Sequence, residues 1–192
     1  MTSSGGRVAQ IGDVAGVANE LAAAMNEYTP WSVSNSSLPE FAAGAHPVIR
    51  AACWPARALL TRRAVARRVR SETPDLVHLH WARYAPFITS GSTPLVVHAH
   101  GSDVRGRRGS ASGRIVYRAL EHAALVLAAT PDLLVDLPDG AVHVPNPIDT
   151  ERFRPGPGCS AERARVLIFA RLTEVKGADV IIDAARAIRR AR

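Results

Sequence analysis

The chain has 192 residues, 47% of them hydrophobic, which is enough to bury one substantial core or one core and part of a second. It contains no run of about 18 apolar residues, so we expect no membrane-spanning helix. The net charge of +7, almost all from arginine, suits nucleic acid, an anionic membrane surface or phosphorylated ligands. No zinc knuckle, aromatic–basic RNA signature or helix-turn-helix spacing is present, so we predict no nucleic-acid partner.

The amino terminus and the cysteines indicate a reducing compartment. MTSSGGR leads straight into a short apolar run and lacks the basic region and long apolar segment of a signal peptide. Cys53 and Cys159 have no metal-ligand spacing, and two lone cysteines do not make a disulfide framework. We therefore predict a cytoplasmic protein.

The chain opens with a pattern typical of a strand, a turn and a helix. Arg7–Ile11 is predicted to be a strand, and Gly12–Gly16 the turn after it. The apolar residues that mark one face of the following helix are Val17, Leu21, Ala24 and Met25. The glycines are four apart and do not form G-x-G-x-x-G, so the dinucleotide fingerprint is absent and we expect no cofactor. Gly16 has two interpretations: a tight strand-to-helix turn or a binding loop.

The next segments predict a strand at Trp31–Ser34, a long loop with a short helix over residues 35–54, and a helix over residues 56–71. The helix carries an apolar stripe with arginines along its edge. The stripe comprises Leu59, Val65, Ala66 and Val69, and the arginines are Arg63, Arg67 and Arg70. Such a basic edge suits anionic lipid, and a solvated helix face is the simpler interpretation.

Two buried-type strands, Asp75–His80 and Leu95–His100, each end in His-x-His. The period of two places both histidines of a pair on one face, so neighbouring strands would gather four imidazoles. No carboxylate or cysteine is placed to complete a zinc shell, and we predict no metal. Ligands of open α/β sheets bind past the carboxyl ends of the strands. This predicts His80 and His100 at the crevice, with His78 and His98 inside as hydrogen-bonded core.

The remaining elements alternate between helix and strand. The sequence predicts a basic, glycine-rich loop at residues 104–113, a helix from Ser112 to Ala123, a strand at Ala124–Ala128, a helix start at Thr130–Pro131 and a strand at Ala141–Val144. This alternation predicts an α/β fold with a doubly wound parallel sheet, which we place in residues 1–155.

The last stretch combines an apolar run, Val166–Ala170, with a basic turn and a helical pattern. Lys176, the only lysine in the chain, lies in this turn beside Gly177, and Arg171 precedes them. Free N–H groups at a helix start together with two cations suit a phosphate or diphosphate. An ordinary solvated helix start is the alternative interpretation.

Two segments carry a resemblance to a known family. VPNPIDTERFRP (residues 144–155) resembles the P-N-[GP]-[IV]-D-x-x-x-F-x-P linker of GT-B glycosyltransferases, in particular the large retaining family four. ARLTEVKGADVIIDA (residues 170–184) resembles the G-R-L-x-x-x-K-G turn that follows it, with Ala170 in place of the usual glycine. The resemblance implies a Rossmann-like N-terminal domain at 1–155 and an incomplete donor-side domain, one βα unit, at 156–192.

The resemblance also implies roles for particular residues. Arg171 and Lys176 would bind the diphosphate of a UDP- or GDP-sugar donor. VHAHGSD (residues 97–103) resembles the family's histidine stretch, which places His100 near the transferred sugar and Asp103 beside it, positioning hydroxyls. By its own chemistry Asp103 is equally a turn or capping aspartate. The predicted acceptor side comprises Gly12, Asp13, Gly16 and His80.

The implied function is transfer of a sugar, with retention, to an acceptor hydroxyl on a sugar or a lipid-linked molecule. The family's acidic E-x7-E region does not occur in this sequence, so we expect a truncated chain with weak or no activity. We expect the protein in the cytoplasm, either free or peripheral at the inner face of the membrane. Two alternatives stay open. One is a non-catalytic remnant that binds an acceptor or partner, and the other is a GT-B protein similar to nucleotide-sugar 2-epimerases.

Overall fold

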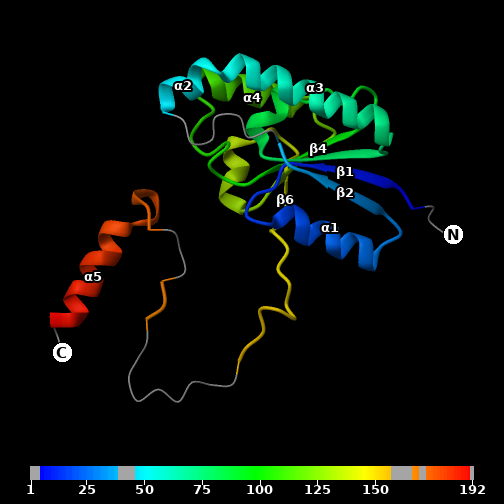
Figure 1. Ribbon diagram of the computed structural model, residues 1–192. Coiled ribbons are helices and arrows are strands. Elements are labelled where there is room, and N and C mark those ends of the chain that lie inside the picture. Colours follow the sequence, from blue (N-terminus) through cyan, green and yellow to red (C-terminus); the bar gives the residue numbers. More distant parts are fainter. Residues whose placement is uncertain (1–4, 39–45, 157–165, 169–171, 191–192) are drawn as a thin grey trace. The chain divides into compact units, whose positions relative to one another are not determined.

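The computed structural model describes residues 5–38, 46–156, 166–168 and 172–190. The chain divides into two compact units, Met1–Phe153 and Arg154–Arg192. The larger unit is built on a six-stranded sheet, and the described part of the smaller one holds a 3-10 turn and a helix (Figure 1).

The sheet of the larger unit is parallel throughout. Its strands, in order across the sheet, are β2 (Ser32–Ser36), β1 (Arg7–Ile11), β3 (Leu76–His80), β4 (Leu95–Ala99), β5 (Leu125–Ala128) and β6 (Val142–His143). The chain adds β2 on one side of β1 and β3 on the other, so the strand order reverses at β1 and β3. The predicted doubly wound parallel sheet is confirmed, and its switch point lies where ligands of such sheets bind.

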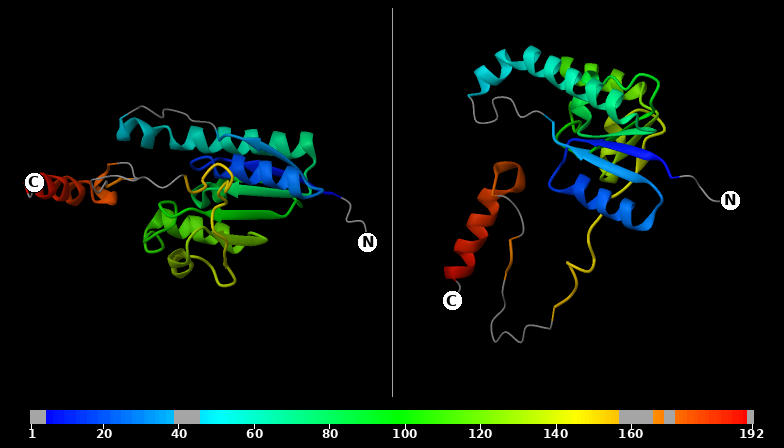
Figure 2. Two further views of the ribbon diagram at one scale, coloured as in Figure 1. Left: turned by 90° about the horizontal axis from the view of Figure 1, so that it is seen from below. Right: turned by 45° about the vertical axis from the view of Figure 1, so that its right-hand side comes forward.

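Helices cover both faces of this sheet (Figures 1 and 2). On one face lies α1 (Val17–Tyr28), and on the other lie α3 (Trp54–Glu72) and α4 (Ala111–Glu121). The shorter elements are α2 (Pro47–Ala52) and the 3-10 turns η1 (Ala82–Phe87) and η2 (Pro131–Asp136). None of the helices in the described ranges is both long and apolar enough to cross a bilayer.

The central strand β3 shows how the sequence positions the core and the site on opposite faces. Val77 and Leu79 have no exposed surface and pack with Val65 of α3 and Leu120 of α4. His78 and His80 alternate with them and lie on the other face. Because both faces of a central parallel strand are covered, its residues are buried almost without interruption.

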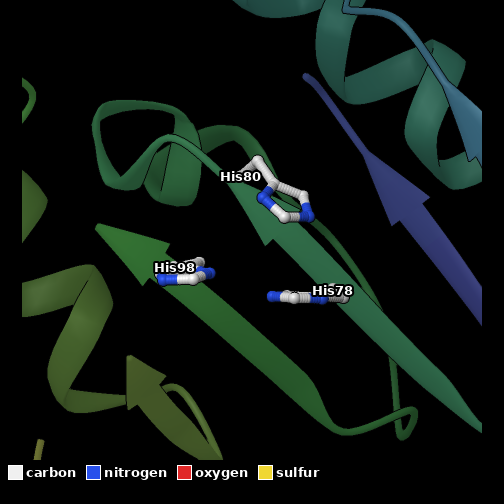
Figure 3. A group of neighbouring side chains, drawn as sticks. All are labelled: His78, His80 and His98. Atoms are coloured by element: carbon white, nitrogen blue, oxygen red, sulfur yellow. The ribbon is translucent and has the colours of Figure 1, made fainter. Parts of the chain in front are cut away.

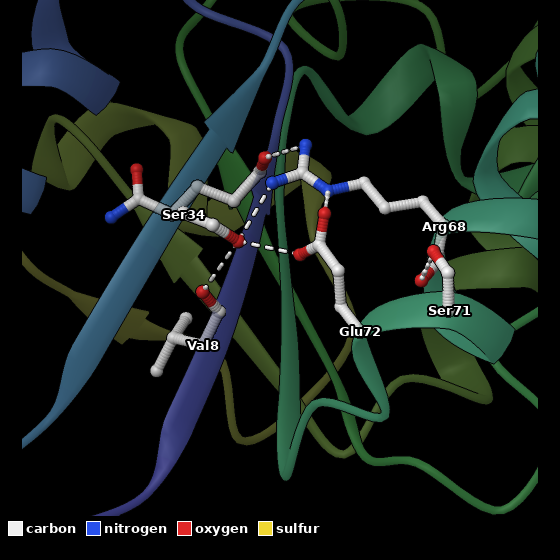
Figure 4. Close-up of polar contacts among 6 residues, drawn as sticks. Val8, Ser34, Arg68, Ser71 and Glu72 are labelled. Atoms are coloured by element: carbon white, nitrogen blue, oxygen red, sulfur yellow. Dashed lines mark hydrogen bonds and ion pairs between the residues drawn. The ribbon is translucent and has the colours of Figure 1, made fainter.

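A polar network joins α3 to the first two strands (Figure 4). Arg68 donates from Nε to Glu72 at 2.8 Å, from Nη2 to the hydroxyl of Ser34 at 2.7 Å, and from Nη1 to the Gln10 carbonyl at 3.2 Å. The Ser34 hydroxyl lies 2.7 Å from the second carboxylate oxygen of Glu72. The side chain of Arg68 is only 12% exposed, so these bonds satisfy a charge that the helix places against the sheet.

One local prediction for α3 is wrong and one for the segment after β5 is confirmed. Leu59 is 47% exposed and does not belong to the buried stripe of α3. Six residues separate Leu59 from Val65, which at about 100° per residue places their side chains about 120° apart. The helix start predicted at Thr130–Pro131 is confirmed, because Thr130 is the N-cap of the six-residue 3-10 helix η2.

The smaller unit begins its described structure with η3 (Glu174–Lys176), followed by α5 (Ala178–Arg190). The predicted helix is confirmed. The predicted strand Val166–Ala170 is wrong for residues 166–168, which form no strand, and residues 169 and 170 lie outside the described residues. A strand pairs its backbone groups with a neighbouring strand, and the described part of this unit contains none. No described residue of α5 is buried, and Val180 is 67% exposed.

Candidate functional site

The carboxyl ends of β1, β3 and β4 meet at one edge of the sheet. The register places His80 of β3 opposite His98 of β4. Gly12 directly follows β1, and His100 directly follows β4. Because β1 and β3 are the strands at which the order reverses, this edge is the place where a ligand site is expected.

Four histidines gather along this edge, as the two His-x-His strands predicted. His78, His80 and His98 project from the same face of β3 and β4 (Figure 3). The ring centroids of His78 and His80 are 4.3 Å apart, and the rings of His78 and His98 stack at 5.9 Å. The ring of His100 continues the row, 4.4 Å from that of His98.

Only one member of this row reaches the surface. The side chains of His78, His80 and His98 are buried, whereas His100 is half-buried. His80, which was expected at the crevice together with His100, is buried there and contacts His100 directly. A buried imidazole needs partners for its nitrogens, and His80 finds them in Gln10 and His100.

A hydrogen-bonded chain runs from Gln10 through His80 to His100. Nε2 of His80 lies 3.1 Å from the side-chain oxygen of Gln10, and Nδ1 lies 3.2 Å from Nε2 of His100. If the Gln10 oxygen accepts from His80, then Nδ1 of His80 accepts from His100 and both tautomers are set. His98 bonds through Nε2 to the carbonyl of Val144 at 3.2 Å. His78 was expected to be hydrogen-bonded as well, but its buried Nε2 has no partner among the described residues.

The surroundings of the four histidines in this row favour their neutral form. Burial, and then the charge that neighbouring histidines would carry, lower the pKa of His78 to about 4 and that of His80 to about 2. Burial likewise lowers the pKa of His98 to about 4. Burial also lowers the pKa of His100, and the Asp103 carboxylate and the Asn146 side chain offset part of that shift. The site therefore presents neutral imidazole to a ligand.

The described part of the chain brings one group of potential metal ligands together. Nitrogens of His78, His80 and His98 all lie within 4.8 Å of one another, and neutral imidazole is the form that binds metals. The predicted absence of a metal stays a prediction.

Asp103 organises the loops that follow β3 and β4. Its buried carboxylate accepts from the backbone N–H groups of Ala82 at 2.8 Å, Gly101 at 2.8 Å and His100 at 3.1 Å. These are the bonds of a turn-forming aspartate, which was the alternative to a role in positioning hydroxyls. The carboxylate holds the backbone of His100 in place.

The turn Gly12–Gly16 lies at the same edge and carries the start of α1. Gly12 has φ +79°, and an added Cβ would lie 2.8 Å from the backbone oxygen of His80, so only glycine fits there. Gly16 has φ +85° with open space around it. Asp13 accepts from the N–H of Ala18 at 3.0 Å and from Asn19 at 3.1 Å, which fixes the turn to the helix.

A cavity of about 240 Å³, here called the β1–β3 cavity, opens beside this turn. Its lining comprises Gly12, Asp13, Ser37, Leu38, Arg57, His80, Trp81, Arg83 and Tyr84. Sequence reasoning placed Gly12, Asp13 and His80 here and missed the two arginines and the aromatic pair. The signal was the segment Trp81-Ala-Arg-Tyr84, which puts cationic and aromatic residues directly after a strand that ends at the ligand edge.

The proposed donor residues belong to the smaller unit. Arg171 lies outside the described residues, as does Ala170. Lys176 is exposed at the end of η3, and Gly177 has φ +69°. The N–H groups of Lys176, Gly177 and Ala178 bond to the carbonyls of Thr173 and Glu174, so these three are not free for a phosphate.

A doubly wound parallel sheet with a half-buried neutral histidine and a glycine turn at its switch point defines a Rossmann-like ligand-binding domain. The family model of Glycosyltransferase Family 4 matches residues 14–152, so the chain belongs to this family of glycosyltransferases. The comparison with curated proteins found no match. The predicted relationship to glycosyltransferases is thus confirmed at the level of the family.

Proposed function

We propose that this protein takes part in the transfer of a sugar, with retention, from a UDP- or GDP-sugar to an acceptor hydroxyl. The observation that carries the proposal is the position of His100. In a chain that belongs to a glycosyltransferase family, this half-buried histidine lies at the ligand edge of the sheet. It lies 3.2 Å from His80, which lines the β1–β3 cavity. The other three histidines of the row are buried.

His100 is the catalytic residue in this proposal. As a neutral imidazole it contacts a hydroxyl of the transferred sugar, or its oxocarbenium-like state, without adding a positive charge beside it. His80 and Gln10 position its ring, and Asp103 positions its backbone. Preorganised groups of this kind stabilise a transition state without reorganisation during the reaction.

The acceptor occupies the β1–β3 cavity in this proposal, with Gly12 and Asp13 at its wall and Gly16 in the same turn. The acceptor is a sugar or a lipid-linked molecule. Gly12 lets the ligand approach the backbone closely, because no side chain intervenes.

Arg171 and Lys176 bind the donor diphosphate in this proposal. Negative charge grows on the leaving diphosphate as the sugar departs, and two cations stabilise it. The described residues of the smaller unit form no strand, and no described residue of α5 is buried. We therefore expect donor binding, and turnover, to be weak for this chain alone.

We further propose a cytoplasmic protein that contacts the inner face of the membrane through α3. Arg63, Arg67 and Arg70 are exposed on this helix, and Leu59 is exposed with them. Each such arginine contributes about 1 kcal/mol to binding an anionic surface.

The test measures transfer from a panel of UDP- and GDP-sugars to mixed sugar and lipid acceptors, with products identified by mass spectrometry. We expect slow transfer by the wild type, loss of at least tenfold in His100→Ala, and little change in His122→Ala, which alters an exposed histidine outside the row. Transfer that is equally fast in His100→Ala contradicts the proposal.

Two other outcomes would support the alternatives. Release of free sugar from the donor without any acceptor indicates chemistry of the 2-epimerase type. Acceptor binding with no detectable affinity for any nucleotide sugar indicates a binding protein.

A further inference from the structure

The β1–β3 cavity collects hydrogen-bond donors that have no acceptor. Arg57 enters it from α3, and Trp81 and Arg83 come from the end of β3 and from η1. Nε of Arg57, Nε of Arg83 and Nε1 of Trp81 are buried N–H groups without a partner among the described residues. Buried polar groups in proteins are nearly always paired, so three orphan donors at one cavity point to a missing acceptor.

The two guanidinium groups share one neutral oxygen. Arg57 and Arg83 both donate from Nη2 to the hydroxyl of Tyr84, Arg83 at 3.2 Å. Arg83 also stacks over the ring of Trp81, with its guanidinium carbon 3.8 Å from the ring centroid. A hydroxyl group carries no charge, so it holds two cations together without compensating either of them.

The carboxylates near the cavity are already engaged. Asp13 lines it, but both of its oxygens accept bonds from the start of α1. Asp103 accepts three backbone N–H groups. No carboxylate in the described ranges forms an ion pair with Arg57 or Arg83. The pair is therefore an uncompensated, partly desolvated positive centre, and such a centre is costly unless an anion binds it.

We propose that Arg57 and Arg83 bind a phosphate group, and that the acceptor is a phosphate ester. The description of the ligand as the acceptor rests on the proposed function; the phosphate site itself does not. A phosphomonoester carries about −1.5 to −2 charges at pH 7, which matches two guanidinium groups, whereas a carboxylate would leave one uncompensated. Arginine forks fit phosphate oxygens in bidentate geometry.

The site is placed to orient an acceptor towards the proposed reacting centre. His80 lines the β1–β3 cavity and lies 3.2 Å from His100, so a phosphate held there anchors its ester beside the crevice. Trp81 has φ +89°, a conformation that a tryptophan adopts only at a cost and that is typical of functional sites. The volume of about 240 Å³ lies below the range for whole small-molecule sites, so the cavity takes one part of the acceptor.

The phosphate ester has two sources, a water-soluble sugar phosphate or the headgroup of a phospholipid. Binding is measured without nucleotide sugar, so the result is independent of turnover. The probes are inorganic phosphate, glucose 6-phosphate and glucose in calorimetry. In sedimentation they are phosphatidylcholine vesicles with and without phosphatidic acid, whose headgroup is a phosphomonoester.

We expect glucose 6-phosphate to bind and glucose not to bind. The variants Arg57→Gln and Arg83→Gln should weaken binding about tenfold or more, because each removes one charged fork. Arg62→Gln, which removes an exposed arginine of the same helix, should change it less than about twofold. Because the two like charges repel, Arg57→Gln should melt no lower than the wild type in phosphate-free buffer.

If Arg57→Gln does not fold, Arg57→Lys replaces it in this comparison. Lysine keeps the positive charge but lacks the two-pronged guanidinium group, so Arg57→Lys should bind glucose 6-phosphate several-fold more weakly than the wild type. Wild-type binding to phosphatidic acid vesicles without binding to glucose 6-phosphate, lost in Arg83→Gln, assigns the phosphate to a lipid headgroup. Absence of binding to every phosphate probe overturns the inference, and so does equal weakening by Arg62→Gln. Phosphate binding without any sugar transfer contradicts the proposed function alone.

Discussion

Nδ1 of the fully buried His80 lies 3.2 Å from Nε2 of the half-buried His100, so the histidine at the crevice takes its ring orientation from a neighbouring strand. The other nitrogen of His80 is bound to Gln10 of β1. One imidazole thereby links β1 and β3 to the loop after β4. The arrangement requires neutral rings, because the four imidazoles lie too close together and too far from water to be charged at once.

This requirement makes stability depend on pH. The folded-state pKa of His78 and His98 is about 4 and that of His80 about 2, against 6.5 for an ordinary histidine. Well above pH 6.5 neither state binds the protons, and these histidines leave stability independent of pH. Between pH 6.5 and about 4 the unfolded chain binds protons at these histidines and the folded chain does not, so the free energy of unfolding falls as the pH falls. Each histidine contributes at most about 1.4 kcal/mol per pH unit. Urea unfolding at several pH values measures the slope.

The matched variants for that experiment are His78→Leu and His122→Gln. His78→Leu removes a group that binds a proton in the unfolded chain but not in the folded chain, so the free energy of unfolding should fall less steeply below pH 6.5. It also removes an imidazole whose Nε2 is unpaired. His122 is exposed, and its replacement should leave the slope unchanged. An unchanged slope in His78→Leu would show that this histidine is protonated in the folded state.

Gly12→Ala and Gly16→Ala form a pair that separates backbone strain from a steric clash. Both residues have positive φ, so alanine costs about 1 kcal/mol at either position. At Gly12 the new Cβ also meets the carbonyl oxygen of His80 at 2.8 Å, and overpacking adds about 1 to 3 kcal/mol. Denaturant midpoints should therefore fall further for Gly12→Ala, and equal losses would mean that the β1 and β3 loops move apart easily.

Asp103→Asn should destabilise the fold by about 2 to 4 kcal/mol, because the amide cannot accept all the backbone bonds that the carboxylate accepts and turns an N–H group towards a donor. Because His100 N–H is one of those donors, sugar transfer should fall as well. Asp132→Asn changes an exposed aspartate bound to Arg105 and should leave the melting temperature almost unchanged. A fully stable Asp103→Asn protein would contradict the structural role of this carboxylate.

Arg68→Lys tests the network between α3 and the first two strands. Lysine keeps the charge but cannot reach Glu72, Ser34 and the Gln10 carbonyl at once, so we expect a loss of about 1 to 2 kcal/mol. Arg67→Lys, at an exposed position one residue away, should change stability by less than about 0.5 kcal/mol. The comparison uses urea midpoints, and similar values for both variants would show that the network adds nothing to stability.

Local pattern was enough to predict the fold of the larger unit. The alternation of apolar strands with amphipathic helices predicted the parallel doubly wound sheet, and the period of two in Leu76–His80 predicted the shared face of its histidines. Local pattern was not enough where a predicted strand needs a second strand to pair with. Residues 166–168 are apolar enough for a strand, yet no described strand of their unit pairs with them, and a strand without a partner leaves its backbone groups unsatisfied.

The sequence by itself determined the sheet, the row of histidines and the glycine turn, because each depends on spacing within a few residues of chain. Only the tertiary structure decided that His80 is buried while His100 is accessible, and that Arg57 and Arg83 meet at the hydroxyl of Tyr84. The two arginines are 26 positions apart on a helix and a 3-10 turn. Their contact follows from how α3 packs beside η1, and no periodicity in the chain encodes that packing.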